Sequence, residues 1–194
     1  MKFRVISADP PWLYDDKLAM SSVKRGADSQ YSTLTLADIM SCGVSCVAAD
    51  DAVLFLWVGG PFVEDALSVM KAWGFKCVQW AGWVKTTKNG LLHFGMGRIF
   101  RYSGELALVG VRGNPKRFLK VRNQRNIFVG RSLKPHSRKT HAFHKRLDRM
   151  FDGPKLEMFA RQQYPRWTCV GLELNGEDVR DSITRLRDLP QPTR

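Results

Sequence analysis

The chain has 194 residues, of which 44% are hydrophobic and 25% charged, and its formal net charge at pH 7 is +13. This length and ordinary composition predict a single domain with a full hydrophobic core over residues 1–194. No apolar run reaches the roughly 18 residues of a membrane-spanning helix, so we expect no membrane association and a cytoplasmic location.

The positive charge is concentrated in the middle of the chain. Residues 85–149 hold 17 basic and 2 acidic side chains, a net of +15, whereas residues 1–84 have a net of −2 and residues 150–194 a net of 0. Solubility alone needs a net charge of only about 2–8 in a small domain. The basic segment 85–149 therefore predicts a surface for a polyanion, and its lack of an amphipathic stripe favours nucleic acid over a membrane.

The predicted elements alternate between strands and helices. In chain order they are a strand over 3–8, a long polar loop over 13–33, a short helix over 35–40, a buried strand over 52–58, a helix over 61–73 and a strand over 75–85. A glycine-containing basic loop follows over 86–100, then strands over 105–111 and 127–129, a basic helix over 140–151, strands over 155–160 and 168–172, and a closing helix over 177–189. This order is typical of an α/β sandwich with a largely parallel sheet.

The tetrapeptide Asp9-Pro10-Pro11-Trp12 follows the first strand directly, at a place where α/β folds bind ligands. The exocyclic amine of adenine is a poor nucleophile because its lone pair is shared with the ring. Two acceptors on its N–H bonds free that pair, and the Asp9 carboxylate and the Pro10 carbonyl can supply them. Pro11 holds Pro10 extended, and Trp12 can stack on a base that has left its duplex. The structural alternative is a proline turn that ends the strand, with Trp12 as a core aromatic.

Other reactive side chains have plain structural interpretations. The four cysteines are few and scattered, which predicts reduced, buried thiols, although Cys42 and Cys46 could share a helix face. His136, His141 and His144 lack carboxylate or thiol partners in the sequence, so we expect no metal site. Glu105 is one of two acids in the basic segment and is expected to organise nearby arginines. We expect the aromatic residues Phe55, Trp57, Trp80 and Trp83 to pack in the core.

With these elements placed, the chain resembles the MT-A seventy family of S-adenosylmethionine-dependent adenine-N6 methyltransferases over roughly residues 3–175. The residues that carry the resemblance are Asp9-Pro10-Pro11-Trp12, Tyr31-Ser32-Thr33-Leu34, Leu54-Phe55-Leu56-Trp57, Gly74-Phe75 with Trp83-Val84-Lys85, Gly104-Glu105-Leu106, Val109-Gly110-Val111-Arg112-Gly113-Asn114-Pro115, His136-Ser137-Arg138-Lys139, Leu156-Glu157-Met158-Phe159-Ala160-Arg161, and Trp167 with Gly171. The resemblance implies a three-layer, Rossmann-like class I methyltransferase in the permuted β-type order, with the amine motif first and the cofactor half last.

The resemblance also implies roles for individual residues. The amine-orienting group is Asp9 with the Pro10 carbonyl, beside Pro11 and Trp12, and Tyr31 is a second contact to the base. The cofactor, S-adenosyl-L-methionine, is expected to contact Asp9, Ser137, Lys139, Glu157, Phe159, Arg161, Gln162 and Glu173. This chain departs from the family pattern after Lys139, after Arg161 and after Gly171.

The expected function is methyl transfer from this cofactor to N6 of adenine in nucleic acid. Phosphate or substrate contacts are expected from Lys85, Lys88, Arg98, Arg101, Arg112 and Lys116, and the loops 13–33 and 86–100 are expected to close over the base. DNA is favoured over RNA because the chain carries no appended RNA-binding domain and compact relatives are often prokaryotic or phage enzymes. The open alternatives are a catalytically inactive nucleic-acid-binding partner subunit, an amino-methyltransferase for cytosine N4 or protein glutamine, and a homodimer.

Overall fold

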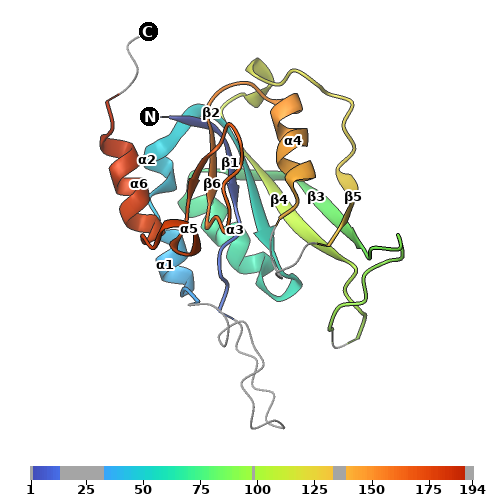
Figure 1. Cartoon of the computed structure of the whole chain (residues 1–194). Helices are drawn as coiled ribbons and strands as arrows, with labels where there is room; N and C mark the ends of the chain where they lie inside the picture. Colours follow the sequence, from blue (N-terminus) through green and yellow to red (C-terminus); the bar gives the residue numbers. More distant parts are fainter. Residues whose placement is uncertain (1, 14–32, 98, 133–138, 191–194) are drawn as a thin grey trace, which may run out of the picture.

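The computed structural model describes residues 2–13, 33–97, 99–132 and 139–190. Its centre is a seven-stranded sheet in the order β5-β3-β4-β2-β1-β6-β7 (Figure 1). The strands are β1 (Phe3–Ala8), β2 (Ala48–Val58), β3 (Lys76–Thr86), β4 (Gly104–Arg112), β5 (Ile127–Arg131), β6 (Lys155–Met158) and β7 (Thr168–Val170).

Only β4 runs against the other strands of this sheet. It pairs antiparallel with β2 and with β3, whereas β1–β2, β1–β6, β3–β5 and β6–β7 are parallel pairs. The carboxyl ends of β1, β3 and β6 therefore share one edge of the sheet with the start of β4. The mostly parallel sheet confirms the predicted Rossmann-like α/β class.

The helices are α1 (Leu36–Met40), α2 (Val44–Val47), α3 (Val63–Ala72), α4 (His141–Met150), α5 (Leu172–Asn175) and α6 (Val179–Asp188), and two 3₁₀ turns cover Gly60–Phe62 and Pro115–Arg117. Side-chain caps fix where several of them begin. Thr35 and Asp38 form a capping box at α1, and the Thr140 hydroxyl and the Asp178 carboxylate accept from N–H groups of the first turns of α4 and α6.

Helices cover both faces of the sheet, which gives three layers. Ile6 and Leu54 face one hydrophobic cluster, to which α1, α2, α3 and α6 contribute. Their neighbours Val5 and Val53 face the other cluster, which α4 closes with Phe143 and Leu147. Successive strand residues point to opposite faces, so this alternation places one core on each side of the sheet.

Most predicted elements are confirmed with shifts of a few residues at their ends. The first strand lies at Phe3–Ala8 as expected, whereas β2 begins at Ala48, four residues before its predicted start. The strand predicted over 168–172 ends at Val170, and Leu172 begins the helix α5. Helix α2 was not predicted, because four residues are too few to show a helical period.

Two predictions about side chains are wrong. Trp80 is 47% exposed, while Phe55, Trp57 and Trp83 are buried as expected. Cys42 is buried but Cys46 is exposed, so the two thiols do not share a face, and only Cys42 of the four free cysteines is fully buried. Within the described ranges, no helix is long and apolar enough to span a bilayer.

Candidate active site

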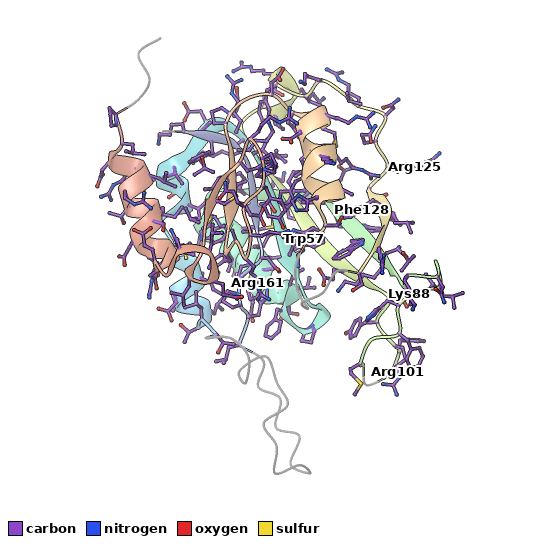
Figure 2. The ribbon with its side chains drawn as sticks, viewed as in Figure 1. Trp57, Lys88, Arg101, Arg125, Phe128 and Arg161 are labelled. Carbon is purple, nitrogen blue, oxygen red and sulfur yellow. The ribbon has the colours of Figure 1, made fainter. Side chains whose placement is uncertain are left out.

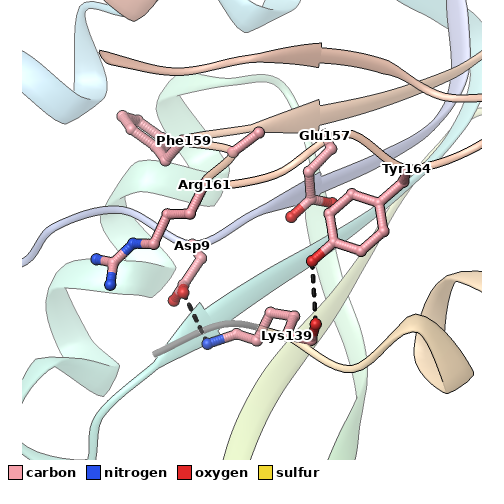
Figure 3. Close-up of a pocket in the computed structure, with 7 residues that line it drawn as sticks. Asp9, Lys139, Glu157, Phe159, Arg161 and Tyr164 are labelled. Carbon is pink, nitrogen blue, oxygen red and sulfur yellow. Dashed lines mark hydrogen bonds and ion pairs between the residues drawn. The ribbon is translucent and has the colours of Figure 1, made fainter. Parts of the chain in front are cut away.

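The Asp9 side chain lies beside a hollow at the carboxyl edge of the sheet. Asp9 follows the last residue of β1, between β2 and β6, and its side chain is 20% exposed. The hollow is lined by Asp9, Lys139, Glu157, Phe159, Ala160, Arg161 and Tyr164 and measures about 220 Å³ including the space open to solvent (Figure 3). Asp9 therefore borders a hollow, whereas Pro10 and Trp12 beside it in the chain are buried.

A buried lysine is paired with the Asp9 carboxylate. Lys139 Nζ lies 2.7 Å from Asp9 Oδ2 and 2.7 Å from Glu105 Oε2, and it stands 4.7 Å from the centroid of the Trp57 ring. Burial alone would lower the pKa of Lys139, but the two carboxylates outweigh it and hold that pKa above its ordinary value. The ammonium is therefore charged at neutral pH, in contact with Asp9.

Glu105 joins this lysine to a second one. Lys85, from β3, also forms an ion pair with Glu105, at the start of β4. Burial would raise the pKa of Glu105, but the ammonium groups of Lys139 and Lys85 lower it to about 2. The expected arginine partners of Glu105 are therefore two lysines, and Lys85, a predicted substrate contact, is engaged inside the protein.

The prolyl corner is fixed by backbone hydrogen bonds. The Trp12 N–H donates to the Pro10 carbonyl at 2.9 Å, and the Leu34 N–H donates to the Pro11 carbonyl at 3.0 Å. A carbonyl oxygen has two lone pairs, so Pro10 retains one for a further donor. The second bond ties the corner to the residue before Thr35, the N-cap of α1.

Trp12 is packed in the core, as the structural alternative for the prolyl corner proposed. Its side chain is 6% exposed, its ring N–H donates to the Trp57 carbonyl at 3.0 Å, and Phe62 stacks on it at 5.7 Å between ring centroids. The expected stacking platform for a base is therefore a packed core aromatic in this structure. Its contribution to the site is to hold the corner against β2.

Two residues that line the hollow, Glu157 and Tyr164, belong to a buried polar cluster that the sequence did not predict. His144 Nε2 is 2.8 Å from Glu157 Oε2, and the His144 ring stacks on Tyr164 with 3.5 Å between centroids. The Tyr164 hydroxyl donates to the Lys139 carbonyl at 3.0 Å (Figure 3). The expectation that His144 lacks a carboxylate partner is therefore wrong, because β6 and α4 bring Glu157 to it.

The segment after β6 is held in an unusual backbone conformation. Phe159 has φ near +60°, which a residue with a side chain rarely adopts and which costs of order 1 kcal/mol. The Ala160 N–H donates to the Val170 carbonyl at 2.9 Å, and a Cβ on Gly171 would lie 2.4 Å from the Ala160 carbonyl oxygen. Gly171 therefore allows this segment to lie close against the end of β7.

The remaining predicted cofactor residues meet at the same edge. Arg161 Nε lies 3.1 Å from Glu173 Oε1, which joins the segment after β6 to the first turn of α5. The Gln162 amide donates to the Tyr164 hydroxyl at 2.8 Å and to the Lys139 carbonyl at 3.3 Å. Asp9, Lys139, Glu157, Phe159 and Arg161 thus come together, with Gln162 and Glu173 in contact with members of the group.

The predicted substrate residues do not all meet at this hollow. Arg112 ends β4 and Lys116 follows it, so both lie at the opposite edge of the sheet, about 30 Å along the strand from its start. They are too far from Asp9 to contact the same nucleotide. Lys88 and Arg101 are exposed between β3 and β4. Tyr31, Arg98 and Ser137 lie outside the described residues.

Three residues of the site were not assigned a role in it by the sequence. Tyr164 and His144 carried no signal beyond their residue types. Glu105 carried a signal in the sequence. It is one of two acids among 17 basic residues in segment 85–149, and a buried acid needs a cationic partner. Across the described ranges, no group of three or more potential ligands is close enough to hold a metal ion.

A sequence model of the family described as MT-A70 matches residues 3–173 of this chain. The chain belongs to the MT-A70 family. The match covers both the Asp9 corner and the segment after β6, so the two halves of the hollow lie within one family domain. The resemblance inferred from the motifs is confirmed.

Three relatives of this chain are named as methyltransferases. The chain is 32% identical over 193 residues to the type II methyltransferase M.MunI of a Mycoplasma species, which covers 89% of this chain and 78% of that protein. It is 31% identical over 188 residues to the human N(6)-adenosine-methyltransferase catalytic subunit METTL3, with 93% of this chain and 30% of that protein covered. It is also 31% identical over 179 residues to the N(6)-adenosine-methyltransferase MT-A70-like of Arabidopsis thaliana, with 90% and 24% covered.

This chain thus spans less than a third of the length of the human and Arabidopsis adenosine methyltransferases, and more than three quarters of the length of the type II methyltransferase. Its similarity to the longer proteins is confined to one region of each. Membership of a family of methyltransferases is established on this basis.

Proposed function

We propose that this MT-A70 family member transfers a methyl group from S-adenosylmethionine to N6 of adenine in nucleic acid, with DNA preferred to RNA. The observation that carries the proposal is the Asp9 corner. It offers the Asp9 carboxylate at a hollow that Lys139 and Glu157 also line, and the Pro10 carbonyl follows Asp9 directly in the chain. An aromatic amine has two N–H bonds, and two acceptors side by side match them.

Asp9 acts on the amine as an acceptor. Its carboxylate takes one N–H bond and the free lone pair of Pro10 takes the other, which localises the nitrogen lone pair for attack. The neutral amine need not lose a proton first. Once the N–C bond has formed and the S–C bond has broken, the nitrogen is cationic and passes its proton to the Asp9 carboxylate, which returns it to water. Lys139 must release Asp9, or share it, when the amine arrives, because its ammonium lies 2.7 Å from the same carboxylate.

The side chains around the hollow fit the cofactor. When bound, S-adenosylmethionine supplies a methyl carbon on a positively charged sulfur that leaves as a neutral thioether. Lys139 suits the carboxylate of its methionine end, and Glu157 suits hydroxyl groups of its ribose. Ser137, another expected cofactor contact, lies outside the described residues, so the side chains around the hollow form part of the proposed cofactor site.

The substrate class follows from the charge. Segment 85–149, with a net of +15, supports a polyanionic substrate over a free small molecule or a protein side chain. DNA is proposed over RNA because the chain is similar to a type II methyltransferase, M.MunI, over 89% of its own residues and 78% of that protein.

Asp9→Asn tests the assignment. The amide keeps the size of the side chain but presents an N–H₂ group to the substrate amine, so we expect methyl transfer to fall by at least about 100-fold. The measurement is incorporation of label from tritiated S-adenosylmethionine into matched DNA and RNA oligomers, followed by nucleoside analysis. Label in N6-methyladenine from DNA supports the proposal, and label in cytosine N4 would replace it.

Calorimetry with S-adenosylmethionine is the companion measurement. The Asp9→Asn protein should still bind the cofactor, because Lys139 and Glu157 remain. A wild-type protein that binds nucleic acid but no cofactor would instead identify a catalytically inactive partner subunit. Equal methylation by wild type and Asp9→Asn would remove Asp9 from the mechanism.

A further inference from the structure

Residues 87–97 and 99–103, here called the finger, form an exposed loop that projects from the edge of the sheet where Asp9 lies. It leaves after Thr86, the end of β3, and returns at Gly104, the start of β4. Among its described residues, the His93 N–H donates to the Lys85 carbonyl and the Gly95 N–H to the Tyr102 carbonyl, both at 2.9 Å. Figure 2 shows Lys88 and Arg101 on the finger, at the margin of the molecule and apart from Arg161.

The finger presents large apolar side chains to water. Seven of them are between 55% and 89% exposed, namely Leu91, Leu92, Phe94, Met96, Ile99, Phe100 and Tyr102. Hydrogen bonds within the finger hold this backbone in place, so the exposure belongs to a folded segment. Seven large apolar side chains exposed within one short segment are typical of a place where another molecule is contacted.

The positive charge of the finger favours a negatively charged partner. Between Lys85 and Glu105 the sequence has three basic residues and no acidic one. Arg101 lies over Phe94 with 5.3 Å from the guanidinium carbon to the ring centroid, which places a cation beside the apolar surface. A second copy of the chain would bring the same cations to a two-fold contact, where like charges repel. A nucleic-acid duplex offers phosphates for the cations and stacked bases for the apolar groups.

The base of the finger is connected to the proposed catalytic residue. Lys85 and Glu105 flank the finger and pair with each other, and Glu105 pairs with Lys139, which pairs with Asp9. Three successive ion pairs thus link the finger to the carboxylate that would accept the adenine amine. An adenine that reaches Asp9 has left its stack, and the finger starts and ends at the edge of the sheet that carries Asp9.

We propose that the finger inserts an apolar side chain into the duplex at the position that the target adenine vacates. We assign this role to Ile99 and Phe100, two neighbouring apolar residues that are 89% and 82% exposed. The inserted group replaces the lost stacking on the neighbouring bases, while Lys88 and Arg101 contact the flanking phosphates. This inference rests on the proposed function and adds to it a duplex substrate and a mechanism for exposing the base.

The test compares Ile99→Ser/Phe100→Ser with wild type on a duplex, on the same strand alone, and on a duplex with abasic positions opposite the adenines. We expect methylation of the intact duplex to fall by at least about tenfold, with the other two substrates changed less than about threefold, because their adenines are already free of pairing. Leu67→Ser is the matched control, since Leu67 is an exposed leucine on α3, outside the finger.

A second readout separates this inference from the proposed function. In a mixed-sequence duplex with 2-aminopurine in place of some adenines, wild type should raise the fluorescence by unstacking the analogue, and the double variant should not. This result stands even if no methyl transfer is found. Equal losses on all three substrates would overturn the inference. So would a change in oligomeric state of the variant by sedimentation velocity without a change in fluorescence, which would assign the surface to a second copy.

Discussion

Lys139 connects two parts of the site, because its ammonium pairs with both Asp9 and Glu105. It comes from the segment just before α4, yet its ammonium lies within 2.7 Å of carboxylates from the end of β1 and the start of β4. A lysine that is 6% exposed is stable as a cation only when such partners surround it. The same contacts mean that removing any one carboxylate changes the charge balance around the others.

Glu105→Gln should make the stability of the protein less sensitive to acid. The pKa of Glu105 is lowered from 4.5 to about 2 in the folded state, so its ionic contribution is complete above about pH 5 and is lost as the pH falls toward 2. The variant lacks this contribution at every pH. At pH 7 we expect it to lose about 1–3 kcal/mol of unfolding free energy, and to lose less than wild type on going to pH 3.5.

Urea unfolding of both proteins at pH 7 and pH 3.5 measures this difference. Glu64→Gln on the exposed side of α3 is the control, because it removes the same charge without a buried partner. If Glu105→Gln and wild type lost equal stability between the two pH values, the ion pairs with Lys139 and Lys85 would carry no net stabilisation.

At the scale of elements, the close approach of two strand ends shapes the hollow. The segment after β6 bends through Phe159 and Ala160, and Gly171 after β7 packs against it. The fit depends on backbone atoms, which cannot move aside as a flexible side chain can. The sequence placed Gly171 inside a predicted strand over 168–172, and only the pairing of β6 with β7 in the structure showed its contact with Ala160.

Gly171→Ala should therefore disturb the fold and the cofactor end of the hollow together. The added Cβ would lie 2.4 Å from the carbonyl oxygen and 2.5 Å from the nitrogen of Ala160. We expect a loss of about 1–3 kcal/mol in unfolding free energy and weaker binding of S-adenosylmethionine. Chemical denaturation and calorimetry measure the two effects.

Gly90→Ala is the comparison, since nothing lies within 4 Å of the Cβ it would gain, although its φ of +78° adds a backbone cost of its own. Weakened cofactor binding in Gly171→Ala but not in Gly90→Ala would locate the effect at the hollow. Unchanged binding in both would separate the β6–β7 contact from the cofactor.

At the scale of the whole molecule, the basic segment covers one side of the protein. It includes β4, β5 and α4, and Figure 2 shows Arg125 near β5 and α4, on the side away from α6. Arg122, Arg125, Arg131, Lys145 and Arg149 are exposed there. The net charge of the chain is therefore carried largely by a face that continues toward the finger.

Binding to nucleic acid should depend strongly on salt. If six or more phosphates are neutralised, affinity should fall by about 10³-fold or more between 50 and 200 mM salt. Arg125→Gln should weaken binding to all sequences similarly and reduce the slope of log K against log salt by about 1. Arg187→Gln on α6 is the control and should leave the slope unchanged. Fluorescence anisotropy with labelled oligomers measures both, and equal slopes for all three proteins would place the interface elsewhere.

The amino-acid sequence by itself determined the order of the elements, the position of Asp9 and Pro10 at the end of the first strand, and the location of the basic segment. These features are local: periodicity reports which face of a strand or helix is buried, and charge can be counted along the chain. They were sufficient for the α/β class and for the family.

Only the tertiary structure decided which side chains meet. Lys139 and Glu105 are separated by 34 residues and pair because β4 lies between β2 and β3. His144 and Glu157 meet because α4 packs over the sheet beside β6, and Trp12 is buried because α3 begins beside β2 with Phe62 stacked on its ring. Such contacts depend on the order and direction of strands in space, which no local pattern of residues encodes.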